Sequence, residues 1–188
     1  MSTGSKSSEV TTLPNLLSLS RIAAVPLIVP LFYWPSPIAD WLALALFAAA
    51  SFTDFLDGRI ARARGQFSDF GRLVDPIADK LLVAAVLVLL VAFDRAPAVA
   101  AVVIVVRELT VSGLREFLAG RAAALPTTKL AKWKTAVQMV AICLLLVHLP
   151  AVQPWGEALL WLAAALTLVT GYDYVRRGLQ VVLGGGRG

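Results

Sequence analysis

Long apolar stretches separated by short polar segments run along almost the whole of this 188-residue chain. A helix that crosses a bilayer needs about 20 mainly apolar residues. Six stretches reach that length: residues 14–34, 38–58, 72–93, 97–119, 132–149 and 155–177. The segments between them are too short for a second folded unit. The pattern therefore predicts one all-α integral membrane domain of six transmembrane helices over residues 1–188, with residues 1–12 and 183–188 as flexible ends.

Composition supports the bilayer as the solvent of this chain. Hydrophobic residues make up 59% and charged residues 15%, whereas soluble domains have about 45–50% apolar and about 25% charged residues. This apolar excess excludes a disordered chain, and the single Cys143 excludes a disulfide within the chain. A net charge of +5 would suggest nucleic acid for a soluble protein. Here it indicates basic loops against anionic lipids, and no nucleic-acid partner is expected.

The distribution of cations predicts how the chain is oriented. Arginines and lysines gather after the second and fourth apolar stretches and at the end of the sixth, whereas the opposite loops carry only Arg95. Loops rich in arginine and lysine stay in the cytoplasm. Because an even number of crossings returns the chain to its starting side, we expect a multi-pass protein of the bacterial inner membrane with both termini in the cytoplasm.

Four aspartates stand at the cytoplasmic ends of the second and third stretches. Asp54 and Asp57 are three residues apart, and Asp75 and Asp79 are four apart, so each pair shares a helix face. Helices joined by a short connection are antiparallel neighbours, which would bring all four carboxylates to one depth. Their mutual repulsion favours bound cations, and oxygen ligands in this number favour two Mg²⁺ or Mn²⁺ ions. The pattern predicts a polar active-site cavity at the cytoplasmic side.

Small residues and one arginine accompany these aspartates. Gly58, Ala61 and Gly71 remove side-chain bulk where a ligand could approach the backbone. Arg62 adds a planar donor fork that suits phosphate oxygens. Carboxylates, glycines and arginine together indicate a diphosphate site. A small divalent-cation transporter is the alternative from a different class, although its carboxylates would be expected nearer the middle of the membrane, often within inverted repeats.

The aspartate region resembles the signature of the CDP-alcohol phosphatidyltransferase family. The matching run is Asp54-Phe-Leu-Asp57-Gly58-Arg-Ile-Ala61-Arg62, then eight residues, then Gly71-Arg-Leu-Val-Asp75-Pro-Ile-Ala-Asp79. Enzymes of this family attack the diphosphate of a CDP-linked lipid with an alcohol and release CMP. The resemblance therefore implies a membrane-embedded transferase that binds CDP-diacylglycerol among membrane lipids, and a homodimer, because the family tends to be homodimeric.

The resemblance also implies roles for single residues. Asp54, Asp57 and Asp75 are expected to hold a pair of divalent ions, and Asp79 to act as the general base while also contacting a metal. The floor of the CDP-lipid site is expected to consist of Gly58, Ala61, Arg62 and Gly71. The single histidine, His148, falls at the outer end of the fifth stretch, so transfer directly to the acceptor is expected without a phosphohistidine intermediate.

Cations on the fourth and fifth stretches indicate an acceptor that carries a phosphate. The expected acceptor-phosphate ligands are Arg107, Arg115, Lys132 and Lys134. The surrounding runs resemble the branch of the family whose acceptor is glycerol 3-phosphate, apart from Ala131, where a glycine is usual. Inositol phosphate, phosphatidylglycerol and serine are the alternative acceptors. A structural role, in which the two arginines pair with Glu108 or Glu116, is a further alternative.

Overall fold

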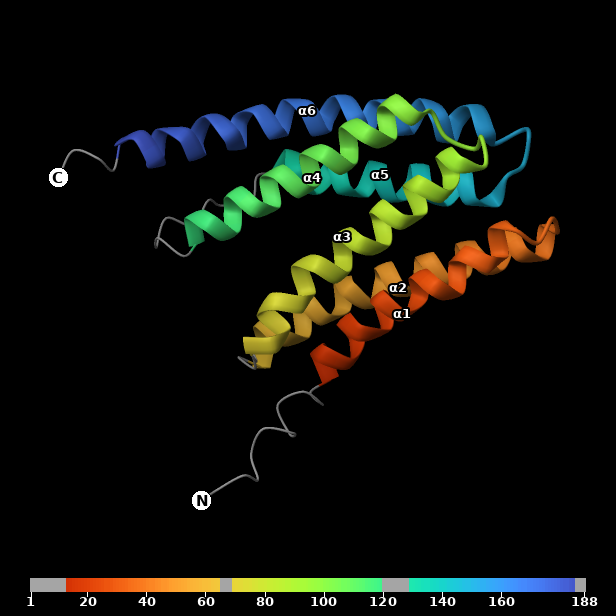
Figure 1. Ribbon diagram of the computed structural model, residues 1–188, viewed down its shortest axis with the longest axis horizontal. Coiled ribbons are helices and arrows are strands. Elements are labelled where there is room, and N and C mark those ends of the chain that lie inside the picture. The colour runs from red at the N-terminus through yellow and green to blue at the C-terminus, as the bar shows by residue number, and fades with distance from the viewer. Residues whose placement is uncertain (1–12, 65–68, 120–128, 185–188) are drawn as a thin grey trace, which may run out of the picture. The chain divides into compact units, whose positions relative to one another are not determined.

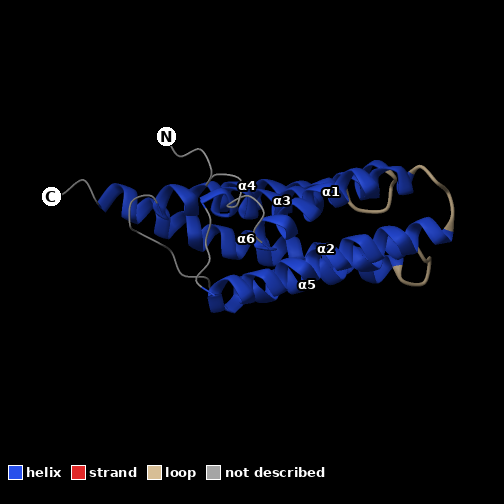
Figure 2. Cartoon of the chain, turned by 90° about the horizontal axis from the view of Figure 1, so that it is seen from below, coloured by secondary structure: helices blue, strands red, loops and turns tan. Residues whose placement is uncertain are grey.

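The computed structural model of this chain describes residues 13–64, 69–119 and 129–184. These residues form six helices and no strand (Figures 1 and 2), so the predicted all-α class is confirmed. The helices are α1 (Leu13–Phe32), α2 (Pro37–Arg64), α3 (Asp69–Ala92), α4 (Ala98–Ala119), α5 (Lys129–Val147) and α6 (Gln153–Gly184). Each predicted stretch corresponds to one helix. α2 extends beyond its apolar stretch into the basic residues 59–64, and α6 extends beyond its stretch over residues 178–184.

Within the described residues, two helices are long and apolar enough to cross a membrane. They are Leu130–Val147 in α5 and Gln153–Gln180 in α6. Shorter apolar segments lie in three further helices, at Ser18–Phe32, Pro37–Thr53 and Lys80–Ala92. These lengths are consistent with a membrane protein. Six crossings and a cavity on the cytoplasmic side stay predictions.

The chain divides into two compact units, Met1–Leu89 and Leu90–Gly188. In the first, the N-terminal unit, α1 packs against α2. Buried apolar side chains repeat at intervals of three or four residues, which places them on one face of each helix. The buried positions are Ala24, Ile28 and Phe32 in α1, and Ala39, Ala43, Phe47 and Ala50 in α2. At the start of α2, the Ser36 hydroxyl accepts a hydrogen bond from the Ile38 amide and caps the helix.

In the second, the C-terminal unit, α6 packs against both α4 and α5. Two glycines of α6 set its register against α4. A Cβ atom at Gly171 would lie 2.9 Å from Cγ of Arg107, and one at Gly178 would lie 2.7 Å from Cδ2 of Leu114. Gly171 and Gly178 are seven residues apart, and so are the residues they face, Arg107 and Leu114. Because the contacts follow the same order along both helices, α4 and α6 run parallel. The short connection between α5 and α6 makes that pair antiparallel.

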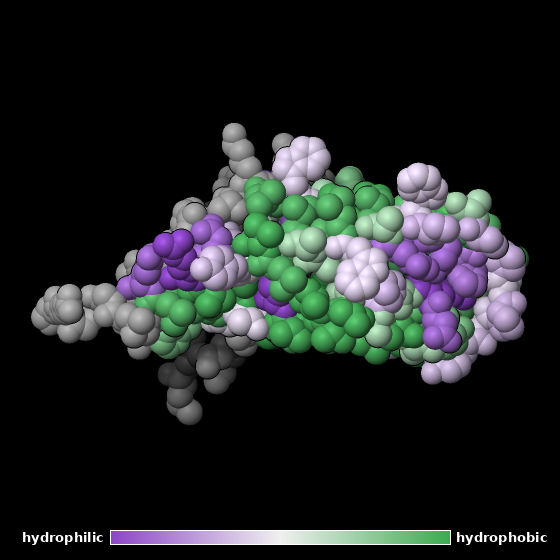
Figure 3. Space-filling view, turned by 90° about the horizontal axis from the view of Figure 1, so that it is seen from above, coloured by the Kyte–Doolittle hydropathy of each residue, from purple (hydrophilic) through white to green (hydrophobic). Residues whose placement is uncertain are grey.

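The outer surface of the C-terminal unit is apolar. Figure 3 shows a broad hydrophobic area over this unit, with hydrophilic groups gathered toward its ends. Large exposed apolar side chains of α4 and α6 contribute to it, among them Val102, Val106, Leu168 and Val169. Exposed apolar side chains on this scale fit a surface that contacts lipid rather than water.

Candidate active site

The four predicted metal ligands lie on two helices that are consecutive in the chain. Asp54 and Asp57 belong to α2, and Asp75 and Asp79 belong to α3, so the helical spacing expected for both pairs is confirmed. Gly58, Ala61 and Arg62 also lie in α2, and Gly71 lies in α3. The side chains of all these residues lie outside the described part of the structure, so the convergence of the carboxylates stays a prediction.

The donor set can be judged by its chemistry. Four carboxylates from the end of one helix and the start of the next supply hard oxygen ligands, which suit Mg²⁺ or Mn²⁺. Among the side chains that the structure describes, no three His, Cys, Asp or Glu residues lie together as a metal site would require. The metal site proposed below for this chain consists of the four aspartates.

A polar cluster inside the C-terminal unit contains two of the predicted acceptor ligands. We define this cluster as Arg107, Glu108, Lys134 and Thr170. Nη1 of Arg107 donates a hydrogen bond to Oε1 of Glu108 over 3.1 Å, and Nζ of Lys134 donates to the same oxygen. Nη2 of Arg107 donates to Oγ1 of Thr170 over 2.8 Å. The cluster thus joins α4, α5 and α6 through charge-assisted hydrogen bonds, which are stronger than neutral ones.

The members of the polar cluster are unequally exposed. The side chains of Lys134 and Arg107 are 4% and 10% exposed, whereas that of Glu108 is 24% exposed. Charged groups at such depth are costly unless they are paired and hydrogen-bonded. The cluster meets this condition through Nη1 and Nη2 of Arg107 and Nζ of Lys134, whereas Nε of Arg107 is buried without a hydrogen-bond partner. Its most exposed member is its carboxylate.

Two features of α6 hold the Arg107 side chain in place. The guanidinium carbon lies 5.8 Å from the ring centroid of Tyr174, which is within the range of a cation–π contact. The absence of a side chain at Gly171 lets the methylene groups of Arg107 lie directly against the helix. The orientation of this guanidinium is therefore determined by contacts to a carboxylate, a hydroxyl, an aromatic ring and a helix backbone.

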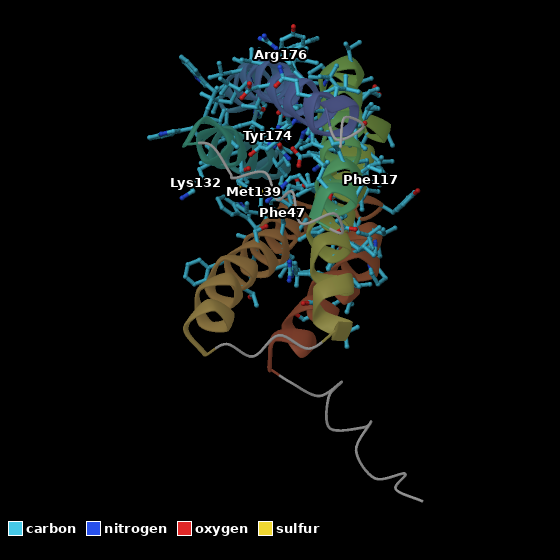
Figure 4. All side chains as sticks on the ribbon, turned by 90° about the vertical axis from the view of Figure 1, so that its left-hand side faces the viewer. Phe47, Phe117, Lys132, Met139, Tyr174 and Arg176 are labelled. Carbon is cyan, nitrogen blue, oxygen red and sulfur yellow. The ribbon has the colours of Figure 1, made fainter. Side chains whose placement is uncertain are left out.

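The other two predicted acceptor ligands lie elsewhere on the same helices. Arg115 and Lys132 are exposed. Lys132 and Lys134 are two residues apart, which places them about 200° apart around α5. Figure 4 accordingly shows Lys132 pointing outward, whereas Tyr174 lies between the helices. Arg115 stands seven residues after Glu108, nearly on the same stripe of α4 and about 10 Å further along it. Of the four predicted ligands, Lys134 is therefore buried and Arg107 partly buried, whereas Arg115 and Lys132 are exposed.

An apolar groove of about 320 Å³ lies between α4 and α6. Its lining is mostly valine, together with Arg107, Thr110, Gly171 and Tyr172. Arg107 therefore borders this groove as well as making its contacts in the polar cluster.

Several residues around Arg107 were not predicted as site residues. The sequence indicates Glu108 only as a possible structural partner of an arginine, and it places Thr170, Gly171 and Tyr174 inside an apolar stretch. One signal was present in the sequence, because Thr170 and Asp173 interrupt an otherwise apolar stretch. The pairing across 63 positions between Arg107 and Thr170 required the three-dimensional structure.

Comparison with known proteins identifies the family. The family model described as CDP-alcohol phosphatidyltransferase matches residues 11–169. This match covers all four aspartates and all four predicted acceptor ligands. The chain belongs to the CDP-alcohol phosphatidyltransferase family.

Relatives with similar sequences cover most of the chain. A Rickettsia bellii protein named CDP-diacylglycerol–glycerol-3-phosphate 3-phosphatidyltransferase is 45% identical over 172 residues, which span 87% of this chain and 93% of that protein. A Bacillus subtilis protein of the same name is 38% identical and spans 90% and 96%, respectively. A rice protein named cardiolipin synthase (CMP-forming) is 39% identical, and the match spans 92% of this chain and 59% of that protein.

Family membership decides between the two classes of function. The chain is a membrane phosphatidyltransferase, as its aspartate signature predicted, and the transporter alternative is set aside. Enzymes of this family generally use divalent ions. The acceptor is a separate question, because the relatives carry two different names.

Proposed function

We propose that this chain transfers the phosphatidyl group of CDP-diacylglycerol to glycerol 3-phosphate, forming phosphatidylglycerophosphate and CMP. The observation that carries this proposal is the 45% identity to a protein named for that reaction, over nearly the full length of both chains. The buried cations of the polar cluster support it, because an acceptor with a phosphate requires positive charge in its binding site.

The aspartates are the proposed metal site. Asp54, Asp57 and Asp75 would hold two divalent ions, Mg²⁺ or Mn²⁺, with Asp79 as a further ligand. When bound, such ions neutralise the charge that develops on the diphosphate and on the departing CMP. Gly58, Ala61 and Gly71 would leave room for the cytidine diphosphate, and Arg62 would bind its phosphate oxygens.

The proposed reaction is a direct displacement at phosphorus. Asp79 accepts the proton of an acceptor hydroxyl, whose oxygen forms a bond to the phosphorus that carries the diacylglycerol. The bond between that phosphorus and the oxygen leading to CMP breaks, and CMP leaves with the electron pair. Arg107 and Lys134 would bind the phosphate of glycerol 3-phosphate, with Arg115 and Lys132 as exposed cations on the same helices.

The proposed setting is the bacterial inner membrane, with both termini and the basic loops in the cytoplasm. CDP-diacylglycerol would enter from the surrounding membrane lipids, and glycerol 3-phosphate would enter from the cytoplasm. A homodimer is proposed by analogy with the family.

Phosphatidylglycerol is a second candidate acceptor, because a relative 39% identical to this chain is named cardiolipin synthase. Its phosphate is a diester that carries one negative charge, whereas the monoester of glycerol 3-phosphate carries nearly two. Two buried cations fit the more highly charged acceptor better, and relatives named for glycerol 3-phosphate match over nearly their full lengths.

The test is CMP release by the purified full-length protein with CDP-diacylglycerol and Mg²⁺. Glycerol 3-phosphate, inositol phosphate, phosphatidylglycerol and serine would be offered separately. Stimulation by glycerol 3-phosphate alone is expected, with phosphatidylglycerophosphate as the lipid product in mass spectrometry. Removal of divalent ions with EDTA should stop release, and Mg²⁺ or Mn²⁺ should restore it. Stimulation by another acceptor alone would reject the proposed substrate.

Asp75→Asn tests the metal assignment. Loss of this carboxylate should lower CMP release by about a hundredfold or more, because metal-assisted charge neutralisation is lost, while the melting temperature changes little. Asp94→Asn is the matched control. Asp94 is exposed in the turn after α3, with a φ of 54° that asparagine also adopts readily, so this variant should keep full activity. Substantial activity in Asp75→Asn would contradict the assignment.

A further inference from the structure

Glu108 is the acidic member of the polar cluster, and the proposed reaction has so far given it no role. We propose that Glu108 is a positioning residue that holds Arg107 and Lys134 in the orientation in which both bind the acceptor phosphate. This inference rests on the proposed function, since it requires an acceptor that carries a phosphate.

The first support is geometric. A single oxygen of Glu108 accepts hydrogen bonds from a cation on α4 and from a cation on α5. Lysine and arginine side chains have many rotamers, and ordering them at the moment of binding lowers affinity. The carboxylate orders both side chains before the acceptor arrives. The two cations are therefore presented together, although they come from different helices.

The second support is the balance of charge. Arg107 and Lys134 contribute two positive charges and Glu108 one negative charge, which leaves a net charge of +1. Two neighbouring cations repel each other when partly desolvated, and the carboxylate between them offsets that repulsion. The remaining positive charge still favours a phosphate monoester.

A competing explanation is that Glu108 occupies the position of the acceptor phosphate and is displaced by it. The contacts of Arg107 favour positioning instead. Nη2 of Arg107 is held by Thr170, and its methylene groups lie against Gly171, so the guanidinium is fixed by α6 as well as by Glu108. Glu108 is thus one part of a frame around the cation. The two explanations predict opposite changes in acceptor affinity when the carboxylate is neutralised.

The experiment compares Glu108→Gln with Glu116→Gln in the full-length protein. Both changes neutralise a carboxylate on α4, and Glu116 is exposed two turns away. Glu108→Gln should raise the KM for glycerol 3-phosphate by about ten- to a hundredfold, the effect of losing a hydrogen bond to a charged group. The kcat and the KM for CDP-diacylglycerol should stay within about twofold. Glu116→Gln should leave all three constants unchanged.

Three results would overturn the role of Glu108: an unchanged acceptor KM, a lowered acceptor KM, or an equal loss toward both substrates. The lowered KM would indicate the displaced carboxylate, and the equal loss a merely structural residue. The wild-type assay keeps the two proposals apart. If the wild type does not use glycerol 3-phosphate, the proposed function has failed; if it does and Glu108→Gln keeps its KM, only this inference has failed.

A second pair of variants tests the same frame without changing a charge. Thr170→Val removes the hydroxyl that accepts from Nη2 of Arg107 and preserves the side-chain shape. It should raise the acceptor KM by roughly three- to tenfold, consistent with one lost hydrogen bond, whereas Thr170→Ser should retain the wild-type value. If Glu108→Gln does not fold, the two Thr170 variants test the inference instead. Equal acceptor KM values for Thr170→Val and Thr170→Ser would overturn it.

Discussion

The interior of the C-terminal unit differs in chemistry between its two halves. Near the turn between α5 and α6 it is apolar, with Leu145 packed directly against Gly156 and with Ile142, Leu146 and Leu160 buried nearby. About 20 Å further along α6, the polar cluster fills the corresponding space. α6 therefore contributes to an ordinary packed core at one end and to a charged site at the other.

We interpret this contrast as a difference in function between the two halves. Apolar packing against small residues is sufficient to associate helices in a membrane. Such packing makes up most of the half near the turn, where Gln153 also donates hydrogen bonds to the Arg95 carbonyl and to Glu157. Charged side chains inside a membrane protein are expensive and usually mark a functional site. The polar cluster, which contains Arg107 and Lys134, is therefore expected to contribute to substrate binding, while breaking it would also lower stability.

The largest effects are expected from single substitutions that disrupt either the polar half or the apolar half of the C-terminal unit. Lys134→Met keeps most of the side-chain volume but removes one of the two cations bound to Glu108, which keeps its contact with Arg107. Stability should therefore fall by about 1–3 kcal/mol, the cost of one hydrogen bond to a charged group. The KM for glycerol 3-phosphate should rise by about tenfold or more. Leu145→Ala should lower stability by about 2–5 kcal/mol, because it leaves a cavity, without changing that KM. Denaturation curves and acceptor kinetics together check the pair. If the acceptor KM rose in proportion to the loss of stability in both variants, the proposed difference in function between the two halves would be wrong.

Two glycines of α6, Gly171 in the polar half and Gly156 in the apolar half, allow the same comparison with a smaller substitution. A Cβ atom would lie 2.9 Å from Arg107 at Gly171 and 2.8 Å from Leu145 at Gly156, so alanine crowds both sites equally. Gly171→Ala should shift Arg107 and raise the acceptor KM by about fivefold, whereas Gly156→Ala should affect only the melting temperature. Equal acceptor kinetics in the two variants would show that the position of Arg107 is not important for binding.

The exposed cations should have the smallest effect on stability. Arg115→Ala should raise the acceptor KM by roughly threefold or more while leaving the CDP-diacylglycerol KM and the melting temperature unchanged. Lys132, which projects from the opposite side of α5 to Lys134, should matter less when changed to alanine. Steady-state kinetics with each substrate varied in turn check this. An unchanged acceptor KM for Arg115→Ala would remove that residue from the site.

The order of the helices could be predicted from the sequence because the length of an apolar stretch depends only on local residues. The ends were less predictable. α2 continues to Arg64, since arginine and alanine are good helix formers that extend a helix beyond its apolar part, and α6 continues to Gly184. The aspartate signature was equally local, with fixed spacing on two successive helices.

The arrangement of the acceptor ligands could not be obtained in the same way. The sequence grouped four cations, but rotation around α5 places Lys132 and Lys134 on opposite sides. The pairing of Arg107 with Glu108 and Thr170 depends on how α4 and α6 pack, and that register depends on close contacts at Gly171 and Gly178. The hydropathy pattern of the sequence predicts which segments form helices, whereas side-chain contacts between helices depend on the rotation and register of each helix.

One competition assay tests the central claim most directly. The purified protein would receive CDP-diacylglycerol, Mg²⁺, glycerol 3-phosphate and phosphatidylglycerol in the same vesicles, and the lipid products would be identified by mass spectrometry. The proposed function predicts phosphatidylglycerophosphate and CMP in equal amounts, with no cardiolipin. Cardiolipin as the main product would contradict the assignment of glycerol 3-phosphate and the role proposed for the buried cations.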